Sequence, residues 1–326
     1  MGIPDRNRDR REHSVRMNMT ARTLTAAGET RLAGASVTRV GFGAARLTAG
    51  DGWGAPQDPA SARNLLLAAV DAGYDYIDTA DALGPGISEQ LIGEALGNRD
   101  DVLVATKVGM LRPAPDAWGV LGLPDYLRQQ IRLSLQRLQR DRIDLLYLHR
   151  IDPDYPLADQ LGALQEARDR GDVGAIGVSE PTAAQLEQVI AVEPGLAAVQ
   201  SLYNPVARRN TAVASRAREL GIPFVAYWPL VGRGLRAEDK ERLFAEFRSI
   251  GERIDLTPHQ LSLAWIFTTQ PHSLAVAGSR SIGHLVQNLV AAGVELDGCL
   301  VAEISQAVER VLGGVPFDPR FPEEER

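Results

Sequence analysis

The chain of 326 residues has few of the residues that mark several large classes of protein. Its single cysteine, Cys299, cannot form an intramolecular disulfide, so we exclude a disulfide scaffold and expect a reducing, cytoplasmic location. No apolar run approaches the roughly 20 residues of a membrane-spanning helix. Acidic residues outnumber basic ones by 42 to 35, which argues against a surface that tracks nucleic acid. We therefore expect neither a membrane nor a nucleic acid as partner, and leave the oligomeric state open.

The sequence also lacks the usual motifs of metal binding and of a serine nucleophile. The five histidines show no pair at the spacing of a zinc-binding helix, and the cysteine stands alone, so no metal site is expected. No G-x-S-x-G pentapeptide is present to hold a serine nucleophile.

A repeating pattern fills most of the chain. Amphipathic stretches end at a glycine or polar turn and are followed by short, continuously apolar runs, which are typical of parallel strands covered on both faces. These runs predict strands near Val40, Ile77, Val104, Leu146, Ile176, Val199, Val225 and Val276. Eight strands alternating with helices predict an α/β fold, a (β/α)8 TIM barrel.

The same pattern predicts the domain boundaries. Residues 20–314 form one barrel domain, preceded by a disordered tail over 1–19 and followed by a surface tail over 315–326. Met17 or Met19 is an alternative start. Gly28 and Gly34 suggest an N-terminal β-hairpin, and residues 236–255 suggest an extra helix. Ser88 is expected to cap one helix at its start, and Gly73 to end another.

A doubly wound nucleotide-binding sheet is the rival fold. It requires the pattern G-x-G-x-x-G after the first strand. Gly41 and Gly43 provide two of these glycines, but Arg46 occupies the third position. The barrel is therefore the favoured prediction.

Three polar residues end apolar runs and are expected to meet at the barrel mouth, where functional residues of such barrels lie. They are Asp78, Lys107 and His149. Lys107 is one of only two lysines, and burying an ammonium group is costly unless it is paired. Asp78 is its expected partner. A purely structural ion pair is the alternative interpretation.

Several motifs together resemble the aldo-keto reductase family, and within it the bacterial aldo/keto oxidoreductases. They span about Leu32 to Gly293 and read GFGAARL, AGYDYIDTADALGPGISEQLIGEAL, ATKVG, RIDLLYLHRID, GAIGVSE, VQSLYN and AGSRSIGHLVQN. The resemblance implies a (β/α)8 barrel, the cofactor NADPH and a tetrad of Asp, Tyr, Lys and His. Asp78, Lys107 and His149 match three members of this tetrad.

The fourth member is missing. The resemblance places the tyrosine, which is the general acid of the family, five residues after Asp78, and residue 83 is leucine. Positioned proton transfer contributes about 10²–10⁴-fold to a rate. We therefore expect poor reduction of ordinary ketones.

The resemblance also implies the cofactor contacts. Ser179 and Gln200 would hold the nicotinamide carboxamide, with Glu180 at a position where many members have asparagine. Tyr203 would stack on the nicotinamide, and Arg280 would bind a 2′-phosphate. The complete expected set is Gly43, Ser179, Glu180, Gln200, Tyr203, Pro229, Leu230, Gly232, Gly278, Ser279, Arg280, His284, Gln287 and Asn288.

The expected substrate contacts fall in loops after strands. Trp53, Leu83, Arg112, Trp118 and Trp228 suggest a small, apolar or polycyclic substrate, although each tryptophan could equally be rim packing. Arg112 could meet an anionic group or remain solvated.

Three functions are compatible with these residues. The first is an NADPH-dependent reductase of an iminium or conjugated substrate in secondary metabolism. The second is a non-redox dehydratase, isomerase or cyclase on the same scaffold. The third is a catalytically silent protein that binds NADP.

Overall fold

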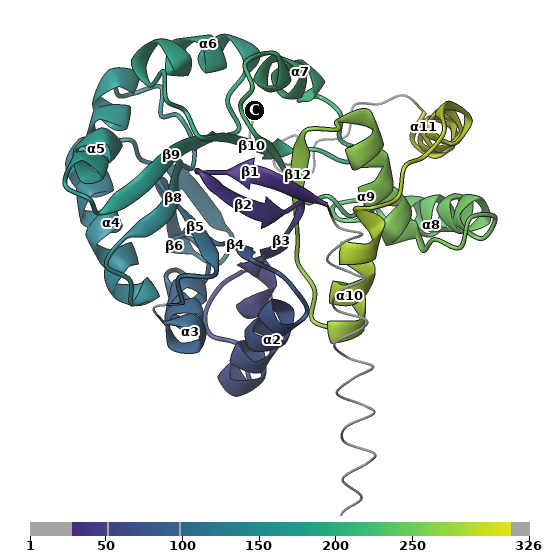
Figure 1. Cartoon of the computed structure of the whole chain (residues 1–326), viewed down its shortest axis with the longest axis horizontal. Helices are drawn as coiled ribbons and strands as arrows, with labels where there is room; N and C mark the ends of the chain where they lie inside the picture. Colours follow the sequence, from purple (N-terminus) through teal and green to yellow (C-terminus); the bar gives the residue numbers. More distant parts are fainter. Residues whose placement is uncertain (1–27, 51, 98, 314–326) are drawn as a thin grey trace, which may run out of the picture.

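The computed structural model describes residues 28–50, 52–97 and 99–313, so the two predicted tails lie outside the described residues. Eight parallel strands form a closed barrel, in the order β3-β4-β5-β8-β9-β10-β11-β12, as the sequence predicted (Figure 1). The barrel strands are β3 (Val40–Gly43), β4 (Tyr76–Asp78), β5 (Leu103–Val108), β8 (Ile143–Leu148), β9 (Val173–Ser179), β10 (Ala198–Leu202), β11 (Phe224–Tyr227) and β12 (Ser273–Ala277).

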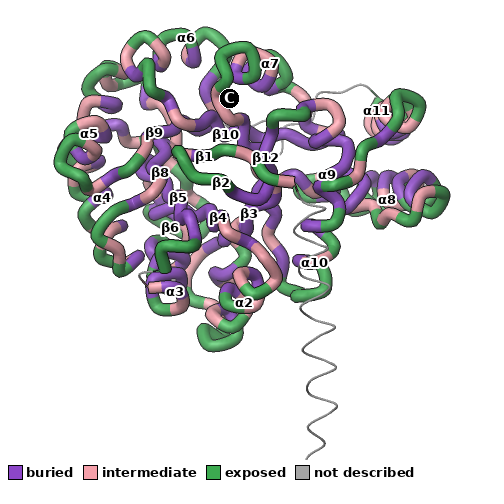
Figure 2. The backbone as a smooth tube through the Cα atoms, viewed as in Figure 1, coloured by how far each residue is buried: buried purple, intermediate pink, exposed green. Residues whose placement is uncertain are grey.

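Helices surround the barrel and bury their inner faces against it (Figure 2). They are α2 (Pro59–Asp71), α3 (Ile87–Leu96), α4 (Pro124–Leu138), α5 (Leu157–Asp169), α6 (Ala183–Val192), α7 (Thr211–Glu219), α9 (Pro258–Thr269) and α10 (Ile282–Ala291), with a short 3₁₀ helix η1 (Ala44–Leu47). Two extra helices, α8 (Ala237–Gly251) and α11 (Gly298–Leu312), pack side by side outside this ring. The sequence predicted α8 but did not single out α11.

The predicted hairpin closes one end of the barrel. It consists of β1 (Glu29–Leu32) and β2 (Ala35–Thr38), drawn in purple across the barrel in Figure 1. Leu32 and Val37 are fully or almost fully buried and pack against Tyr76, Leu103 and other residues inside the barrel. These residues lie at the amino ends of the strands. The candidate site must therefore open at the opposite, carboxyl ends.

Two tyrosines fill the barrel interior. Tyr76 and Tyr147 are completely buried there. Gly41 and Gly177 make room for their rings, because a Cβ at Gly41 would lie 2.3 Å from Tyr76 Cδ1 and one at Gly177 would lie 2.6 Å from Tyr147 Cδ1. Small residues at these two positions thus allow aromatic rings to pack across the barrel.

Two local predictions need correction. Ser88 does not cap a helix: α3 starts after Gly86, and Ser88 lies inside its first turn, where its hydroxyl accepts a hydrogen bond from Thr79. Arg112 and Trp118 do not lie in an irregular loop. They belong to a two-stranded hairpin, β6 (Met110–Ala114) and β7 (Ala117–Val120), inserted directly after β5. The predicted end of α2 is confirmed, with Gly73 at φ 106°.

Across the described ranges, no helix combines the length and apolar character needed to cross a membrane.

Candidate active site

An ion pair lies at the carboxyl ends of β4 and β5, as the sequence predicted. Lys107 Nζ donates to Asp78 Oδ1 at 2.6 Å and to the carbonyl oxygen of Thr79 at 2.7 Å. Both side chains of the pair are buried. Burial lowers the pKa of Lys107 from its ordinary value, and the charge of Asp78 opposes that change.

The second oxygen of Asp78 accepts two further hydrogen bonds. Gln200 Nε2, from β10, donates at 2.8 Å and the hydroxyl of Tyr76 donates at 3.2 Å. Three donors from three strands therefore satisfy this buried carboxylate. Gln200, predicted to bind the cofactor, is in this structure a partner of Asp78.

His149 directly follows β8, the strand paired with β5. Its backbone N–H donates to the carbonyl of Val108 at 2.8 Å, and its Nδ1 is buried without a hydrogen-bond partner. Burial, followed by the charges of Arg150 and Lys107, holds the pKa of His149 well below its usual value. The imidazole is therefore neutral at physiological pH.

Leu83 lies in the turn between β4 and α3. This turn is held against β5, because Asp81 donates its backbone N–H to the carbonyl of Lys107 at 3.1 Å. A Cβ placed on Gly52 would lie 3.9 Å from Leu83 Cδ2 and 3.8 Å from Arg112 Nη1. Leu83 therefore borders the space between the β3 loop and the β6–β7 hairpin.

The two interior tyrosines do not provide the phenol that the family resemblance implies. Tyr76 and Tyr147 have no exposed surface, and burial raises the pKa of both. A phenol with a raised pKa is a weaker acid, and one beneath the Asp78–Lys107 pair cannot touch a substrate in the mouth.

Arg112 joins two of the predicted tryptophans. Its Cζ lies 3.7 Å from the ring centroid of Trp118 and 5.4 Å from that of Trp53. Its Nη2 donates to the carbonyl of Pro115 at 2.6 Å. Arg112 is buried, whereas Trp118 is 46% exposed. This Trp53–Arg112–Trp118 stack forms a wall beside Leu83 and leaves indole surface exposed.

Trp228 stands apart from this stack, after β11. Its backbone is left-handed at φ 49°, and the guanidinium of Arg233 lies 4.0 Å from its ring. The structure thus groups two of the three predicted tryptophans and places the third on another loop of the mouth.

The expected phosphate segment has features that fit an anionic cofactor. Ser281 makes no side-chain cap for α10, so backbone N–H groups at this helix N-terminus remain for an anion. Arg280, His284 and Gln287 are exposed here, and Asn288 Nδ2 is buried without a partner. Residues Arg280 to Asn288 therefore offer charge, helix N–H groups and one unsatisfied donor.

Close contacts position the backbone at the other expected cofactor residues. A Cβ on Gly278 would lie 2.8 Å from the carbonyl oxygen of Gly43, so β3 and β12 meet tightly. The hydroxyl of Ser279 accepts from the backbone N–H of Ser281 at 3.0 Å. The carbonyl of Pro229 accepts from Ser262 Oγ at 2.6 Å, which fixes the loop that continues through Leu230.

Ser179 is buried at the end of β9 and contacts a cation. Arg150 Nη1 donates to its hydroxyl oxygen at 3.1 Å and to the carbonyl of His149 at 2.6 Å. Arg150 therefore links Ser179, the predicted carboxamide ligand, to His149, the predicted catalytic histidine.

The structure does not place Glu180 and Tyr203 as predicted. Oε1 of Glu180 accepts from the backbone N–H of Leu202 at 2.5 Å, and Oε2 pairs with Arg209 at 2.7 Å. The ring of Tyr203 is only 2% exposed and stacks on Trp265 in the helix-facing core. Glu180 thus anchors a loop, and Tyr203 offers no open face to a nicotinamide.

Two cationic side chains near the expected cofactor residues were not predicted from the sequence. A Cβ on Gly278 would lie 3.4 Å from Arg46 Cγ, and one on Gly232 would lie 3.3 Å from Lys240 Cε. Burial and then the charges of His284, Lys240 and Arg46 lower the pKa of His259. The scarcity of lysine was a signal that Lys240, like Lys107, needed an explanation.

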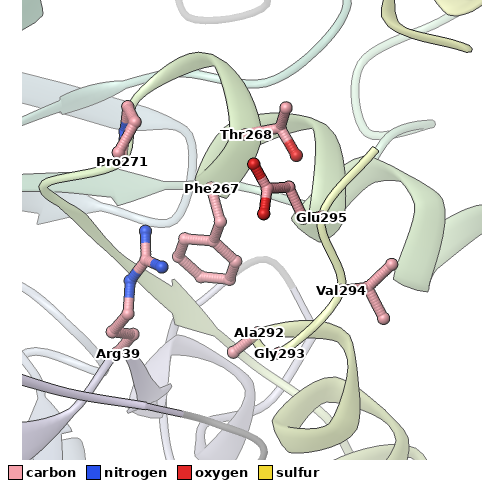
Figure 3. A pocket seen from close by; sticks show the side chains of 8 residues that line it. All are labelled: Arg39, Phe267, Thr268, Pro271, Ala292, Gly293, Val294 and Glu295. Carbon is pink, nitrogen blue, oxygen red and sulfur yellow. The ribbon is translucent and has the colours of Figure 1, made fainter. Parts of the chain in front are cut away.

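A separate pocket of about 270 Å³ lies near the amino ends of β3 and β12, between α9 and the segment after α10 (Figure 3). Arg39 stacks on Phe267 at 4.4 Å, and Glu295 lies on the wall. This pocket is at the opposite end of the barrel from Lys107 and shares no residue with the candidate site.

Comparisons with known proteins agree on one family. The profile of the Aldo/keto reductase family matches residues 39–309. An uncharacterized oxidoreductase of Schizosaccharomyces pombe is 34% identical over 281 residues, covering 86% of this chain and 90% of that protein. The aldo-keto reductase str7 of Strobilurus tenacellus is 35% identical over 309 residues, covering 84% and 89%.

Solved structures show the same likeness. An aldo-keto reductase of Klebsiella pneumoniae, solved in complex with NADPH, superposes with a TM-score of 0.72 at 25% identity, covering 90% of this chain and 97% of that one. The glycerol dehydrogenase of Gluconobacter oxydans superposes with a TM-score of 0.75 at 25% identity, covering 91% and 99%.

Proposed function

Because this chain belongs to the aldo/keto reductase family, we propose that it is an NADPH-dependent oxidoreductase that works without a phenol at position 83. The observation that carries this proposal is the coexistence of the Asp78–Lys107 ion pair with Leu83 in the adjoining turn. The reductase retains its polar site and lacks its usual proton donor.

The residues that would hold NADPH come from the carboxyl ends of β9 to β12. Ser179 and Gln200 would meet the nicotinamide end, and Arg280 with the start of α10 would meet the phosphate of the adenosine end. Arg46 and Lys240 add positive charge between them. When bound, the cofactor supplies a hydride to the substrate.

The absence of a phenol at position 83 indicates the class of substrate. A simple ketone forms an alkoxide when it takes up hydride, and losing a positioned acid costs about 10²–10⁴-fold in rate. An iminium ion or a conjugated carbonyl needs less help, because its charge is neutralised or delocalised. The exposed indole of Trp118 and the half-buried Trp53 favour an apolar, planar or polycyclic molecule, of a kind common in secondary metabolism.

Two measurements test this proposal. Purified protein should quench or shift NADPH fluorescence on binding. It should then oxidise NADPH faster with a cyclic iminium or with benzylideneacetone than with benzylacetone, the saturated ketone. Absence of NADPH binding, or product formation without any nicotinamide, would reject the proposal and favour a non-redox enzyme.

A further inference from the structure

We propose that Lys107 is the proton donor of this reductase and that its substrate is a conjugated or otherwise activated carbonyl compound whose oxygen lies on Lys107 Nζ. This inference rests on the proposed function and deepens it. It assigns to the ammonium group the role that a phenol at position 83 cannot perform, and it chooses a carbonyl over an iminium ion.

The contacts of Lys107 leave it able to reach a substrate. An ammonium group has three N–H donors. Two are directed at Asp78 Oδ1 and at the carbonyl of Thr79, at 2.6 and 2.7 Å. The third makes no hydrogen bond to a described residue, and the side chain keeps 6% of its surface exposed, so we assign this donor to a substrate oxygen. The turn that carries Leu83 begins directly after Thr79, so the leucine and the ammonium group belong to the same corner of the site.

The acid strength of an ammonium group is suitable. Tyrosine and lysine have ordinary pKa values of about 10 and about 10.4, so exchanging one for the other changes the available acidity little. Burial lowers the pKa of Lys107, which strengthens it as an acid. When Lys107 becomes a neutral amine, Asp78 still accepts from Gln200 and Tyr76, so its charge does not remain without donors.

Asp78 balances the charge of Lys107 within their ion pair, and the charges next to that pair favour an oxygen anion over a cationic substrate. Arg150 donates to the carbonyl of His149 at 2.6 Å and to Ser179 Oγ at 3.1 Å, and its charge lowers the pKa values of Lys107 and His149. Asp81 does not offset this charge, because burial and the nearby Glu89 raise its pKa well above the ordinary value. Positive charge attracts an enolate or alkoxide and repels an iminium ion.

The reaction delivers a hydride and a proton to two different atoms of the substrate. The substrate carbon accepts a hydride, which is supplied by the reduced nicotinamide, and the π electron pair moves onto the substrate oxygen. That oxygen takes a proton from Lys107 Nζ, whose N–H bond breaks to leave a neutral amine. Solvent protonates the amine again after the product leaves. For a conjugated alkene, the enol formed in this way isomerises to the saturated ketone.

The first experiment is chemical rescue. In Lys107→Ala, reduction of benzylideneacetone should fall by about 10²–10⁴-fold. Methylammonium should restore at least about a tenth of the lost rate, and tetramethylammonium, which has the same charge and no N–H, should restore none. Equal rescue by both ions would overturn the proposal, because charge alone would then suffice. Arg218→Ala, on the exposed face of α7 and away from the site, controls for general effects of losing a cationic side chain.

The second experiment needs no activity and no loss of Lys107. The chain has two lysines, so ¹⁵Nζ-lysine labelling gives two signals, which Lys240→Arg assigns. The Lys107 signal should titrate below about pH 10.4, and should move when benzylideneacetone is added to protein containing NADP⁺. Titration at or above that value, or no movement while tryptophan fluorescence reports binding, would overturn the proposal. If the protein fails to oxidise NADPH with any activated substrate but the Lys107 signal behaves as expected, the reductase assignment fails, and only the contact between Lys107 Nζ and a carbonyl oxygen stands.

Discussion

At the residue scale, Leu83 has no hydroxyl, so in the proposed function another group must donate the proton to the substrate. Leu83→Tyr restores a phenol in the turn beside Lys107, and we expect it to raise kcat/KM for benzylacetone by about 10- to 100-fold, since proton donation contributes about 10²–10⁴-fold in a tuned site. Steady-state NADPH oxidation measures this. Leu83→Phe is the matched control, because it adds the ring without the hydroxyl. Equal kinetics in the two variants would mean that the hydroxyl has no access to the substrate oxygen.

His149 is expected to stay neutral through the working range. Its pKa is held well below the usual value by burial and by the charges of Arg150 and Lys107, so protonation occurs only in acid. The Cε1–H resonance should therefore not move between about pH 6 and 8, where an ordinary histidine titrates. His149→Asn assigns the signal. A titration centred within that range would show that the imidazole is more solvated than the structure indicates.

The alkaline limb of the pH–rate profile should report Lys107. Only the ammonium form can donate a proton, so the rate falls as pH rises through the pKa of Lys107, which burial lowers. We expect the midpoint below about pH 10.4, and we expect Lys107→Arg to lose the limb together with most of the rate, because guanidinium does not deprotonate. An unchanged limb in that variant would assign it to another group.

At the element scale, the β6–β7 hairpin carries Arg112 and Trp118, which we propose contact the substrate. Arg112→Met removes the cation from between Trp53 and Trp118, where each cation–π contact is worth about 0.5–2 kcal/mol. We expect KM for benzylideneacetone to rise by roughly 3- to 30-fold with kcat nearly unchanged, because the stack binds substrate away from the reacting atoms. Arg112→Lys keeps the charge and loses the planar group. A fall in kcat at constant KM would instead place Arg112 at the chemistry.

The elements that form the barrel were predictable from the sequence, and the elements outside it were less so. Continuous apolar runs predicted all eight barrel strands, because a strand that is buried on both faces consists mostly of consecutive apolar residues. The β6–β7 hairpin was missed because it pairs only with itself and contains prolines, and α11 because it packs on α8 outside the eightfold repeat.

Some site residues were likewise predictable from the sequence and others were not. Asp78 and Lys107 interrupt apolar runs, so their position in the sequence and the scarcity of lysine predicted them. The directions of Glu180 and Tyr203 could not be derived, because adjacent residues at a strand end face opposite sides and tertiary contacts decide between them. Arg209 draws Glu180 to one side, and Trp265 covers Tyr203.

At the scale of the whole molecule, the barrel interior depends on two glycines beneath the site. Gly41→Ala would force a Cβ to within 2.3 Å of the Tyr76 ring, so we expect a loss of about 1–3 kcal/mol in the free energy of unfolding. Urea denaturation measures it. Gly162→Ala, on α5 with open space around the new Cβ, is the control and should be neutral or stabilising by about 0.5–1 kcal/mol. Equal stability of the two variants would contradict the packing described for Tyr76.

The most direct test of the whole account is a single-turnover comparison with NADPH carrying deuterium at the transferred position. With excess protein, benzylideneacetone should acquire one deuterium at least about 10-fold faster than benzylacetone, and Leu83→Tyr should narrow that gap by accelerating the saturated ketone. Equal rates for the two ketones in the unmodified protein would contradict the account, because conjugation of the substrate would then bring no kinetic advantage.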